Sequence, residues 1–330
     1  MDSPNIENLG IVVIGRNEGE RLARCFESIK KSGATIVYVD SGSTDKSIEL
    51  AQELGIEAIA LDPAQPFSAA RARNEGVEYL QSLNRGIEFV QFIDGDCELF
   101  AEWLSAGLEY LQSNSQAVIV CGFLHERHPD ASIYNRFCDL EWDTYVGDLY
   151  SCGGIFMVRL AAFKEVGGFN GAVIAGEEPE LCKRLRANGG QVIRIAKDMA
   201  YHDSAMLHFS QWWMRGVRNG YGGMEILFKY KVGGSFKTAI SICVWGLLLP
   251  ASIVASWIFS SGWVLLVNLI YPLKAFQIAK RMSHLAKKRP ADPWIYSLSC
   301  LTGKFPEAYG QIKYFISALL KKPSKVISHK

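Results

Sequence analysis

The N-terminal half of the chain alternates short apolar runs with amphipathic stretches, which is the pattern of a parallel sheet covered by helices. Apolar runs predict strands at residues 11–14, 36–39, 89–93 and 117–121. Amphipathic stretches predict helices at residues 20–31, 46–54, 69–83 and 101–112. Polar, glycine-rich and acidic residues follow the strands, and open α/β sheets bind ligands at such strand ends. The predicted class is therefore α/β, with a mostly parallel central sheet.

A long apolar stretch dominates the C-terminal part of the chain. Residues 239–273 contain no charged side chain, and about 20 apolar residues suffice to span a bilayer once. Pro250 and the break at residues 260–262 interrupt the stretch, and basic residues flank it on both sides. Basic flanks favour a hairpin or re-entrant helix pair with both ends in the cytoplasm. A single crossing and a buried soluble hairpin are the alternatives.

Composition and charge narrow the function classes. The 330 residues are 49% hydrophobic and 21% charged, with a net charge of +1, which excludes a disordered chain and a general binder of polyanions such as nucleic acid. Residues 271–330 nevertheless contain twelve Lys or Arg against Asp292 and Glu307. A basic tail after an apolar segment is typical of contact with an anionic membrane surface. An ordinary solvated basic helix is the alternative.

The cysteines and the start of the chain indicate the compartment. The eight cysteines are scattered, without the paired short spacing of a zinc or redox site, which is typical of reduced residues in the cytosol. Residues 1–9 are polar and acidic, so they do not have the pattern of a secretory signal. We therefore expect the catalytic part to lie at the cytoplasmic face of the cell membrane.

The central chemical feature is the sequence Asp94-Gly95-Asp96, which follows the predicted strand at residues 89–93. Hard divalent cations such as Mg²⁺ or Mn²⁺ prefer carboxylate oxygens and usually keep substrate phosphates as further ligands. A short acidic turn therefore suits a metal bound together with a diphosphate. Taken alone, Asp-Gly-Asp also forms common surface turns.

Two other polar segments favour a nucleotide site. Residues 39–45 follow the second strand, where an acidic side chain can accept from a base edge, although the same residues can simply cap the next helix. Residues 70–74 supply cations and an amide suited to phosphate or sugar oxygens, with solvated helix arginines as the alternative. No Gly-x-Gly-x-x-Gly follows the first strand and no Gly-Lys-Ser/Thr loop occurs. A nicotinamide dehydrogenase and a P-loop ATPase are therefore disfavoured.

In combination these segments resemble a family 2 glycosyltransferase of the GT-A fold. The matching segments lie in the family's order at residues 12–18, 39–45, 72–74, 93–96, 153–156, 167–169 and 176–181. Their combination is far more specific than any one of them. The interpretation is a GT-A nucleotide-sugar-binding domain at residues 1–225, an interfacial and membrane-inserted helical segment at 226–273, and a basic tail at 274–330.

The resemblance also implies roles for individual residues. Donor contacts are assigned to Asn17, Glu18, Asp40, Arg73, Asp94, Arg215 and Arg218. Asp40 would contact uracil or an equivalent base, and Asp96 would bind the metal-diphosphate. His202 fits a further metal ligand better than His208 does, and either can be a structural histidine. The Trp pair and the arginines at 212–218 can alternatively anchor the chain at a membrane interface without catalysis.

The general base is expected among residues 176–181. In an inverting displacement a carboxylate removes the acceptor hydroxyl proton while metal and cations stabilise the departing diphosphate. The family usually carries Glu-Asp here, and this chain has Glu178 at the second position, which is a departure. Glu178 is the first choice of base, with Glu177 and Glu180 as competitors. The alternative is an acidic cluster that only stabilises a helix N-terminus.

The predicted function is the transfer of a hexose, with UDP-hexose as the expected donor class, by an inverting enzyme that uses Mg²⁺ or Mn²⁺. The expected partners are the nucleotide-sugar donor, a lipid-linked or glycan acceptor in surface polysaccharide biosynthesis, and a membrane. A polyprenyl phosphate acceptor is the closest alternative. A sugar-1-phosphate nucleotidyltransferase lacks support because residues 15–18 do not form its glycine-rich basic loop. A catalytically silent scaffold would not need Asp94, Asp96 and Glu178 together.

Overall fold

The computed structural model describes residues 6–142, 145–173, 176–229, 236–259, 264–287 and 289–320. The chain forms two compact units. The first unit contains residues 1–128 and 142–204, and the second contains residues 129–141 and 205–330. The division at residue 205 differs from the sequence-based boundary at 225, because the helix that follows residue 208 packs within the second unit.

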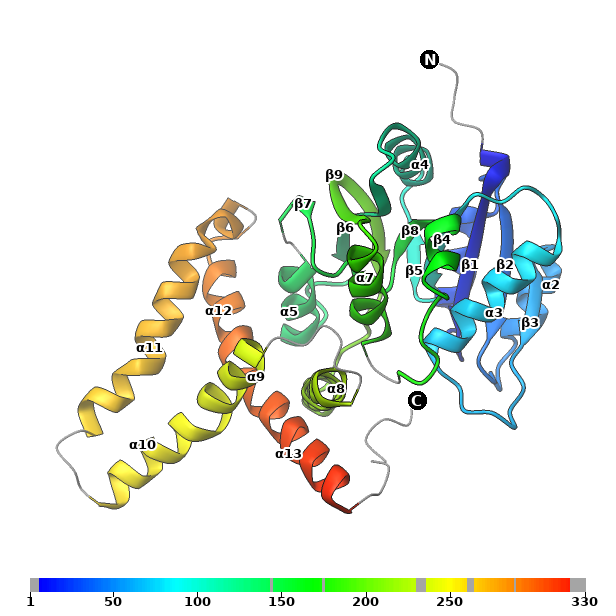
Figure 1. Cartoon of the computed structure of the whole chain (residues 1–330). Coiled ribbons are helices and arrows are strands. Elements are labelled where there is room, and N and C mark those ends of the chain that lie inside the picture. Colours follow the sequence, from blue (N-terminus) through cyan, green and yellow to red (C-terminus); the bar gives the residue numbers. More distant parts are fainter. Residues whose placement is uncertain are drawn as a thin grey trace. The chain divides into compact units, whose positions relative to one another are not determined.

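The first unit is built on one mixed sheet with the strand order β3-β2-β1-β4-β8-β6-β9-β5, and β7 pairs with β9 (Figure 1). The strands are β1 Leu9–Gly15, β2 Thr35–Asp40, β3 Glu57–Ala60, β4 Phe89–Asp94, β5 Cys97–Leu99, β6 Ala117–Glu126, β7 Gly147–Asp148, β8 Phe156–Arg159 and β9 Gln191–His202. Pairing is parallel among β1 to β4 and between β6 and β9. Strand β8 is antiparallel to β4 and β6, while β5 and β7 are antiparallel to β9. The predicted α/β class is confirmed, and its parallel character holds for the N-terminal strands.

The helices of this unit are α1 Glu20–Ile29, α2 Ser47–Glu53, α3 Ala69–Ser82, α4 Trp103–Ser113, α6 Leu160–Glu165 and α7 Glu177–Ala187, with a 3₁₀ turn η1 at Ile6–Asn8. The central strands β1 and β4 are apolar along almost their whole length, as expected for strands covered on both faces. Their side chains form the core with the apolar faces of the helices. Because β1, β2 and β4 run in parallel, their carboxyl ends meet at one edge.

The second unit is helical throughout its described residues. Its elements are α5 Ile133–Trp142, α8 Phe209–Phe228, α9 Phe236–Cys243, the π-helical turn η2 Val244–Leu248, α10 Leu249–Ile258, α11 Val264–Arg281, the 3₁₀ turn η3 Ser283–Lys287, α12 Asp292–Thr302 and α13 Lys304–Leu320. The last residue of α5, Trp142, groups with the first unit. Arg136 of α5 pairs with the fully buried Asp292 of α12 and with Asp139, so ion pairs connect these helices.

Glycines allow helices α8 and α13 to approach closely. A Cβ atom on Gly220 of α8 would lie 2.0 Å from the carbonyl oxygen of Glu307, and one on Gly310 of α13 would lie 2.2 Å from that of Val217. Any larger side chain at these positions would force the backbones apart. Small residues that bring helix backbones together in this way are common between membrane helices.

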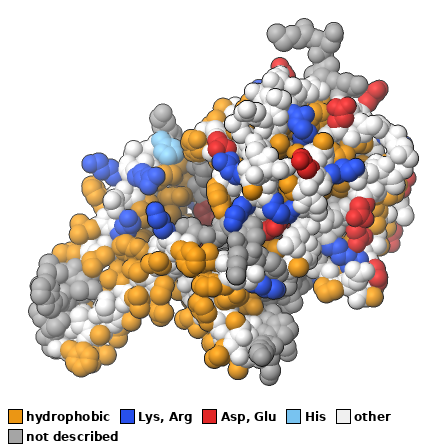
Figure 2. Space-filling model, in the orientation of Figure 1, with side chains coloured by type: hydrophobic (Ala, Val, Ile, Leu, Met, Phe, Trp, Pro, Cys, Tyr) orange, Lys and Arg blue, Asp and Glu red, His pale blue; other side chains and the backbone are white. Residues whose placement is uncertain are grey.

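Helices α9, η2 and α10 are continuous over Phe236–Ile258 and are long and apolar enough to cross a membrane, with a mean hydropathy of 2.0 and only 6% of the apolar window buried. Large apolar side chains are exposed on several helices of the unit, including Trp257, Phe259, Phe276 and Leu319. Figure 2 shows hydrophobic side chains gathered over the visible face of these helices. The predicted break at residues 260–262 lies outside the described residues.

Candidate active site

The loops that follow β1 and β2 are tied together by Asn17. Its side-chain Oδ1 accepts from the backbone N–H groups of Thr44 at 2.7 Å and Asp45 at 3.3 Å. Its own backbone N–H donates to the Ser43 hydroxyl at 2.9 Å. Asn17 has a φ of 55°, a conformation that asparagine adopts more readily than most residues. Asn17 therefore shapes the edge where a nucleotide would bind, and its contact with a donor stays a prediction.

Asp40, at the end of β2, is only 1% exposed. Its carboxylate accepts from the Tyr38 hydroxyl at 2.8 Å, from the backbone N–H groups of Gly42 and Ser43 at 2.9 and 2.8 Å, and from the Ser43 hydroxyl. Burial and the neighbouring Asp40 raise the pKa of Tyr38, so the phenol stays a donor. The Asp40 carboxylate thus stabilises the loop that follows β2. Contact between Asp40 and a base stays a prediction.

Arg73 of α3 joins two other acidic segments. Its side chain is 3% exposed, and its Nη2 and Nη1 atoms each lie 2.9 Å from a carboxylate oxygen, of Asp94 and Glu177 respectively. The guanidinium also lies over the Phe169 ring, 5.5 Å from its centroid. A Cβ on Gly154 would come within 2.8 Å of Nη2 and 3.2 Å of the Asp94 carboxylate. Glycine at position 154 therefore leaves room for this arginine–carboxylate contact.

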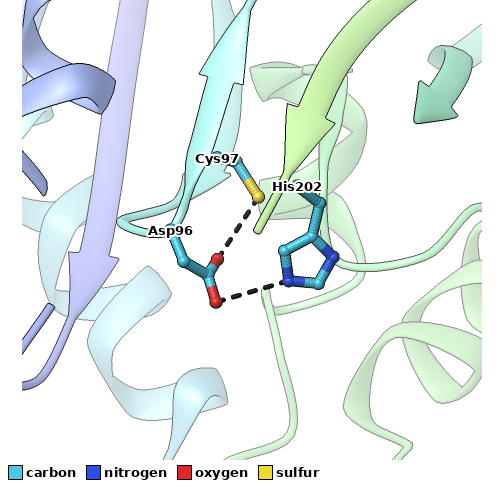
Figure 3. Close-up of side chains that lie close together, drawn as sticks. All are labelled: Asp96, Cys97 and His202. Carbon is cyan, nitrogen blue, oxygen red and sulfur yellow. Dashed lines mark hydrogen bonds and ion pairs between the residues drawn. The ribbon is translucent and has the colours of Figure 1, made fainter. Parts of the chain in front are cut away.

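Asp96, Cys97 and His202 come together where β4 leads into β5 and where β9 ends (Figure 3). His202 Nε2 lies 3.3 Å from Asp96 Oδ2, and the Cys97 thiol donates to Asp96 Oδ1 at 3.3 Å. The His202 ring stacks on Trp142 with centroids 4.8 Å apart. Its Nδ1 is enclosed and has no hydrogen-bond partner among the described residues. The structure thus brings together the two residues predicted as metal ligands.

Burial and charge set the protonation of this cluster. Burial acts to raise the pKa of Asp96, but His202 outweighs it and the pKa is lowered to about 2. Burial raises the pKa of the Cys97 thiol well above its ordinary value. Burial likewise raises the pKa of Asp94, against the opposing effect of Arg73. Asp96 is therefore an ionised oxygen donor, and Cys97 is a neutral thiol that supports it.

This donor set fits a divalent cation. A carboxylate oxygen and an imidazole nitrogen are common ligands, and Mn²⁺ accepts both types, whereas Mg²⁺ prefers oxygen alone. The imidazole of His202 has a carboxylate at one nitrogen and no partner at the other, so hydrogen bonds among the described residues leave it incompletely satisfied. Asp96 and His202 are the side chains that would hold the ion.

Glu178 lies in the first turn of α7 and is 6% exposed. Its Oε1 accepts from the Cys152 backbone N–H at 2.6 Å, from the Cys152 thiol at 3.2 Å and from the Cys182 thiol at 2.9 Å. The backbone of Gly153 also interacts with the Glu178 carboxylate. Burial raises the pKa of Glu178, and these donors oppose that effect. The carboxylate is thus held by thiol and backbone donors of the chain.

The two competing acids of α7 have different partners. Glu177 binds Arg73, and Glu180 is 2% exposed and forms a two-point pair with Arg184. All three acids also lie at the helix N-terminus, where the helix dipole stabilises negative charge. Only Glu178 lacks an ion pair within 4 Å among the described residues of this turn, which distinguishes it from its neighbours.

Glu18 and Arg215 have identifiable ion-pair partners. Glu18 pairs with Arg21 at 2.5 Å, and its side chain lies against Gly95 of the acidic turn. Arg215, in the second unit, pairs with Glu141 at 2.9 Å. Arg218, on the same helix, has its pKa lowered by burial and by Arg215. The donor contacts assigned to Glu18, Arg215 and Arg218 stay predictions.

His208 is the N-cap residue of α8. Its backbone N–H donates to Gln211 Oε1 at 2.9 Å, and its carbonyl oxygen accepts from the Gln211 backbone N–H at 3.1 Å. The sequence interpretation missed other contributors, namely Cys97, Trp142, Cys152 and Cys182. Cys182 had a sequence signal, since it stands four residues after Glu178 on one helix face. Trp142 and Cys152 had none, because only the fold brings them to their partners.

Comparison with known proteins places this geometry in context. Residues 10–166 match the family model described as glycosyl transferase family 2, and residues 127–208 match that of the N-terminal domain of galactosyltransferase. An uncharacterized glycosyltransferase of Rickettsia felis is 30% identical over 106 residues, which cover 32% of this chain and 34% of that protein. A TPR repeat-containing protein of Synechococcus elongatus is 31% identical over 94 residues, 28% of this chain and 22% of that one. This chain thus matches only about a fifth to a third of those relatives' length.

Among solved structures, the mannosyltransferase PcManGT of Pyrobaculum calidifontis, in complex with GDP-Man and Mn²⁺, is similar with a TM-score of 0.62 and 14% identity. The alignment covers 93% of this chain and 87% of that one. TarS 1–349 of S. aureus aligns over 96% and 93% of the two chains, with a TM-score of 0.48 and 13% identity. At this level of identity the similarity to PcManGT establishes the fold, which is GT-A.

Proposed function

We propose that this chain is an inverting family 2 glycosyltransferase that moves a hexose from a nucleotide diphosphate sugar to a lipid-linked or glycan acceptor, and the match of residues 10–166 to that family model supports the proposal. A UDP-linked hexose is the proposed donor. The observation that carries the proposal is the meeting of Asp96 and His202, 106 residues apart in sequence, beside the Asp94–Arg73–Glu177 ion pairs. Carboxylates, an imidazole and a guanidinium thus lie together at the edge of the sheet where α/β folds bind nucleotides.

Asp96 and His202 would hold Mn²⁺ or Mg²⁺, and such an ion, when bound, stabilises negative charge on the departing diphosphate. PcManGT was solved with GDP-Man and Mn²⁺, which is ligand chemistry of the same kind. In this chain Arg73 keeps Asp94 and Glu177 in place from a nearly enclosed position. Asn17 and Asp40 support the loops on which the nucleotide would lie.

Glu178 is the proposed general base. Its carboxylate would accept the proton of an acceptor hydroxyl as the hydroxyl oxygen attacks the anomeric carbon. Glu177 and Glu180 are each engaged in an ion pair, with Arg73 and Arg184 respectively. The absence of such a cation within 4 Å of Glu178 among the described residues favours Glu178 over both neighbours.

The second unit is proposed to bind the cytoplasmic face of the cell membrane. The Phe236–Ile258 helix, the exposed aromatic and aliphatic side chains and the basic residues after 271 support that location. A membrane location in turn favours a lipid-linked acceptor in surface polysaccharide biosynthesis. A polyprenyl phosphate is the second candidate acceptor, since it would occupy the same membrane.

Purified full-length protein in detergent tests the proposal. Incubation with a panel of nucleotide sugars, with Mn²⁺ or Mg²⁺ and with lipid-linked sugar or polyprenyl phosphate, should release free nucleoside diphosphate and give a product of inverted anomeric configuration. Release of inorganic diphosphate would instead identify a nucleotidyltransferase. Retention of configuration would contradict the inverting mechanism.

Glu178→Gln should lower transfer by about 10²- to 10⁴-fold, the usual effect of losing a positioned base, with donor affinity nearly unchanged. Glu102→Gln is the matched control, because the Glu102 side chain is 86% exposed. If Glu177→Gln or Glu180→Gln abolishes transfer while Glu178→Gln does not, the role belongs to that neighbour. If none of the three matters, the proposed mechanism is wrong.

A further inference from the structure

Two buried cysteines donate to the same oxygen of Glu178. Cys182 stands one helical turn after Glu178 on α7, and Cys152 comes from the loop before β8. Their sulfur atoms lie 2.9 and 3.2 Å from Oε1 and 3.7 Å from each other. The Cys152 backbone N–H adds a third donor at 2.6 Å. Three donors thus converge on one oxygen of a carboxylate that is almost enclosed.

We propose that Cys152 and Cys182 are positioning residues that keep Glu178 ionised and hold its carboxylate in place for the acceptor hydroxyl. The inference rests on the proposed role of Glu178 as base. A buried carboxylate without a cation favours its neutral form, and hydrogen bonds to the ionised form oppose that preference. A carboxyl group that is already protonated cannot accept a proton. The two thiols therefore set the pH range in which Glu178 is ionised and can act as a base.

The thiols are suited to this task because they stay protonated. Burial raises the pKa of Cys152 well above its ordinary value. The Cys152 thiol acts to lower the pKa of Cys182, but burial and Glu178 outweigh it and raise that pKa. Each thiol therefore remains a neutral S–H donor. Neutral donors stabilise the ionised carboxylate less than a guanidinium would.

Other titratable groups near Glu178 lie on the sheet. Cys121 of β6 interacts electrostatically with Glu178 and Cys182, and burial raises its pKa to about 11. Arg194 of β9 lies against Cys121 and is the cation that acts on that thiol. Cys121 makes no hydrogen bond to Glu178 among those of the described residues, so the direct donors are the two thiols and the backbone at residues 152–153.

The test compares Cys152→Ala and Cys182→Ala with Cys182→Ser, which retains a donor, and with the control Cys300→Ala in the second unit. Full-length protein in detergent is used for two titrations. One follows the infrared band of the protonated Glu178 carboxyl, assigned by its loss in Glu178→Gln. The other follows kcat/KM for transfer, whose acid limb reports the ionisation of the base in the free enzyme.

Removing a donor from the ionised form raises the pKa of Glu178, so both midpoints should move to higher pH. The expected shift is about one pH unit for each Ala variant, from the usual worth of a hydrogen bond to a charged group. Cys182→Ser should return toward the wild-type midpoint, and Cys300→Ala should not move. Above the limb, the kcat/KM of the Ala variants should lie within about threefold of wild type, because the base itself is intact.

Ala variants that bind donor normally but leave both midpoints unchanged would overturn the inference, since the thiols would then only fill space. If the infrared midpoint moves and the acid limb of kcat/KM does not, the thiols control Glu178 but Glu178 is not the base, and the proposed function fails instead. Should an Ala variant lose donor binding, Cys182→Val fills the site without a donor and gives the same comparison.

Discussion

Replacement of Arg73 by methionine gives a direct measure of how the acidic site is held together. Arg73→Met keeps a long apolar stem over Phe169 but removes two charge-assisted contacts of 2.9 Å, to Asp94 and Glu177. Both carboxylates would then face each other without the cation between them. Their mutual repulsion and partial burial should destabilise the β4 end and the start of α7.

The size of the effect follows from the burial of each partner. Removing one member of a buried pair costs about 3–5 kcal/mol. Glu177 is 17% exposed at its side chain and Asp94 is 34% exposed, so water screens the Asp94 contact in part. We therefore expect the lower end, about 3 kcal/mol. Arg85→Met, at an exposed arginine of the same unit, should change stability by less than about 0.5 kcal/mol.

Hydrogen exchange of the full-length protein is the suitable assay, because the chain has two units and its unfolding need not be two-state. Peptides from α3, β4 and α7 should lose protection in Arg73→Met and keep it in Arg85→Met. Adding Asp94→Asn and Glu177→Gln to Arg73→Met should restore much of the protection, because no unpaired charge remains, while donor binding stays lost. Protection in Arg73→Met equal to that in Arg85→Met would refute the electrostatic reasoning.

Three further outcomes are expected. Asp96→Asn should lose activity and metal-dependent donor affinity while hydrogen exchange stays native, and unchanged turnover in saturating Mn²⁺ would remove Asp96 from the site. Gly220→Ala places a methyl group 2.0 Å from the Glu307 carbonyl oxygen and should lower the free energy of unfolding by about 1–3 kcal/mol. Gly223→Ala, whose methyl group would have nothing within 4 Å, should raise it by up to about 1 kcal/mol. Equal effects of the two substitutions would contradict the close packing of α8. Full-length protein should sediment with membranes and require detergent for release, and recovery in the soluble fraction would overturn the membrane proposal.

Local patterning was sufficient to predict the elements that begin the first unit. The helix expected at residues 20–31 is observed at Glu20–Ile29, and the strand expected at residues 89–93 is observed at Phe89–Asp94. These elements have strong apolar periodicity because they pack against the core on one or both faces. The position of the acidic turn Asp94-Gly95-Asp96 could be predicted from the same pattern, because the turn lies where β4 ends.

The later strands had no such signal. Strand β9 covers Gln191–His202 with several exposed polar positions, and its pairing with β6 contains register shifts, so neither an apolar run nor a regular alternation marks it. Strand β8 has only four residues, Phe156–Arg159. The position of His202 was therefore obtained from the family resemblance, and the strand that carries it was not predicted.

The contacts that define the site also depend on pairings between distant segments. Arg73 and Glu177 are 104 residues apart, and Cys152 and Glu178 are 26 apart. No local pattern specifies such pairs, because a charged side chain is usually exposed to solvent and the sequence around it does not indicate a distant partner. The family resemblance ordered the motifs correctly, but only the structure shows which of the acids in α7 is paired with a cation.

The first turn of α7 shows how three neighbouring acids can differ in chemistry. Glu177 and Glu180 are each bound by an arginine. Glu178 receives neutral donors at one oxygen instead, and burial raises its pKa. A general base works best when its proton affinity is matched to the operating pH. Under the proposed mechanism, the arginines hold the carboxylates of Glu177 and Glu180 in ion pairs, while the thiol partners leave the Glu178 carboxylate available to take the acceptor proton.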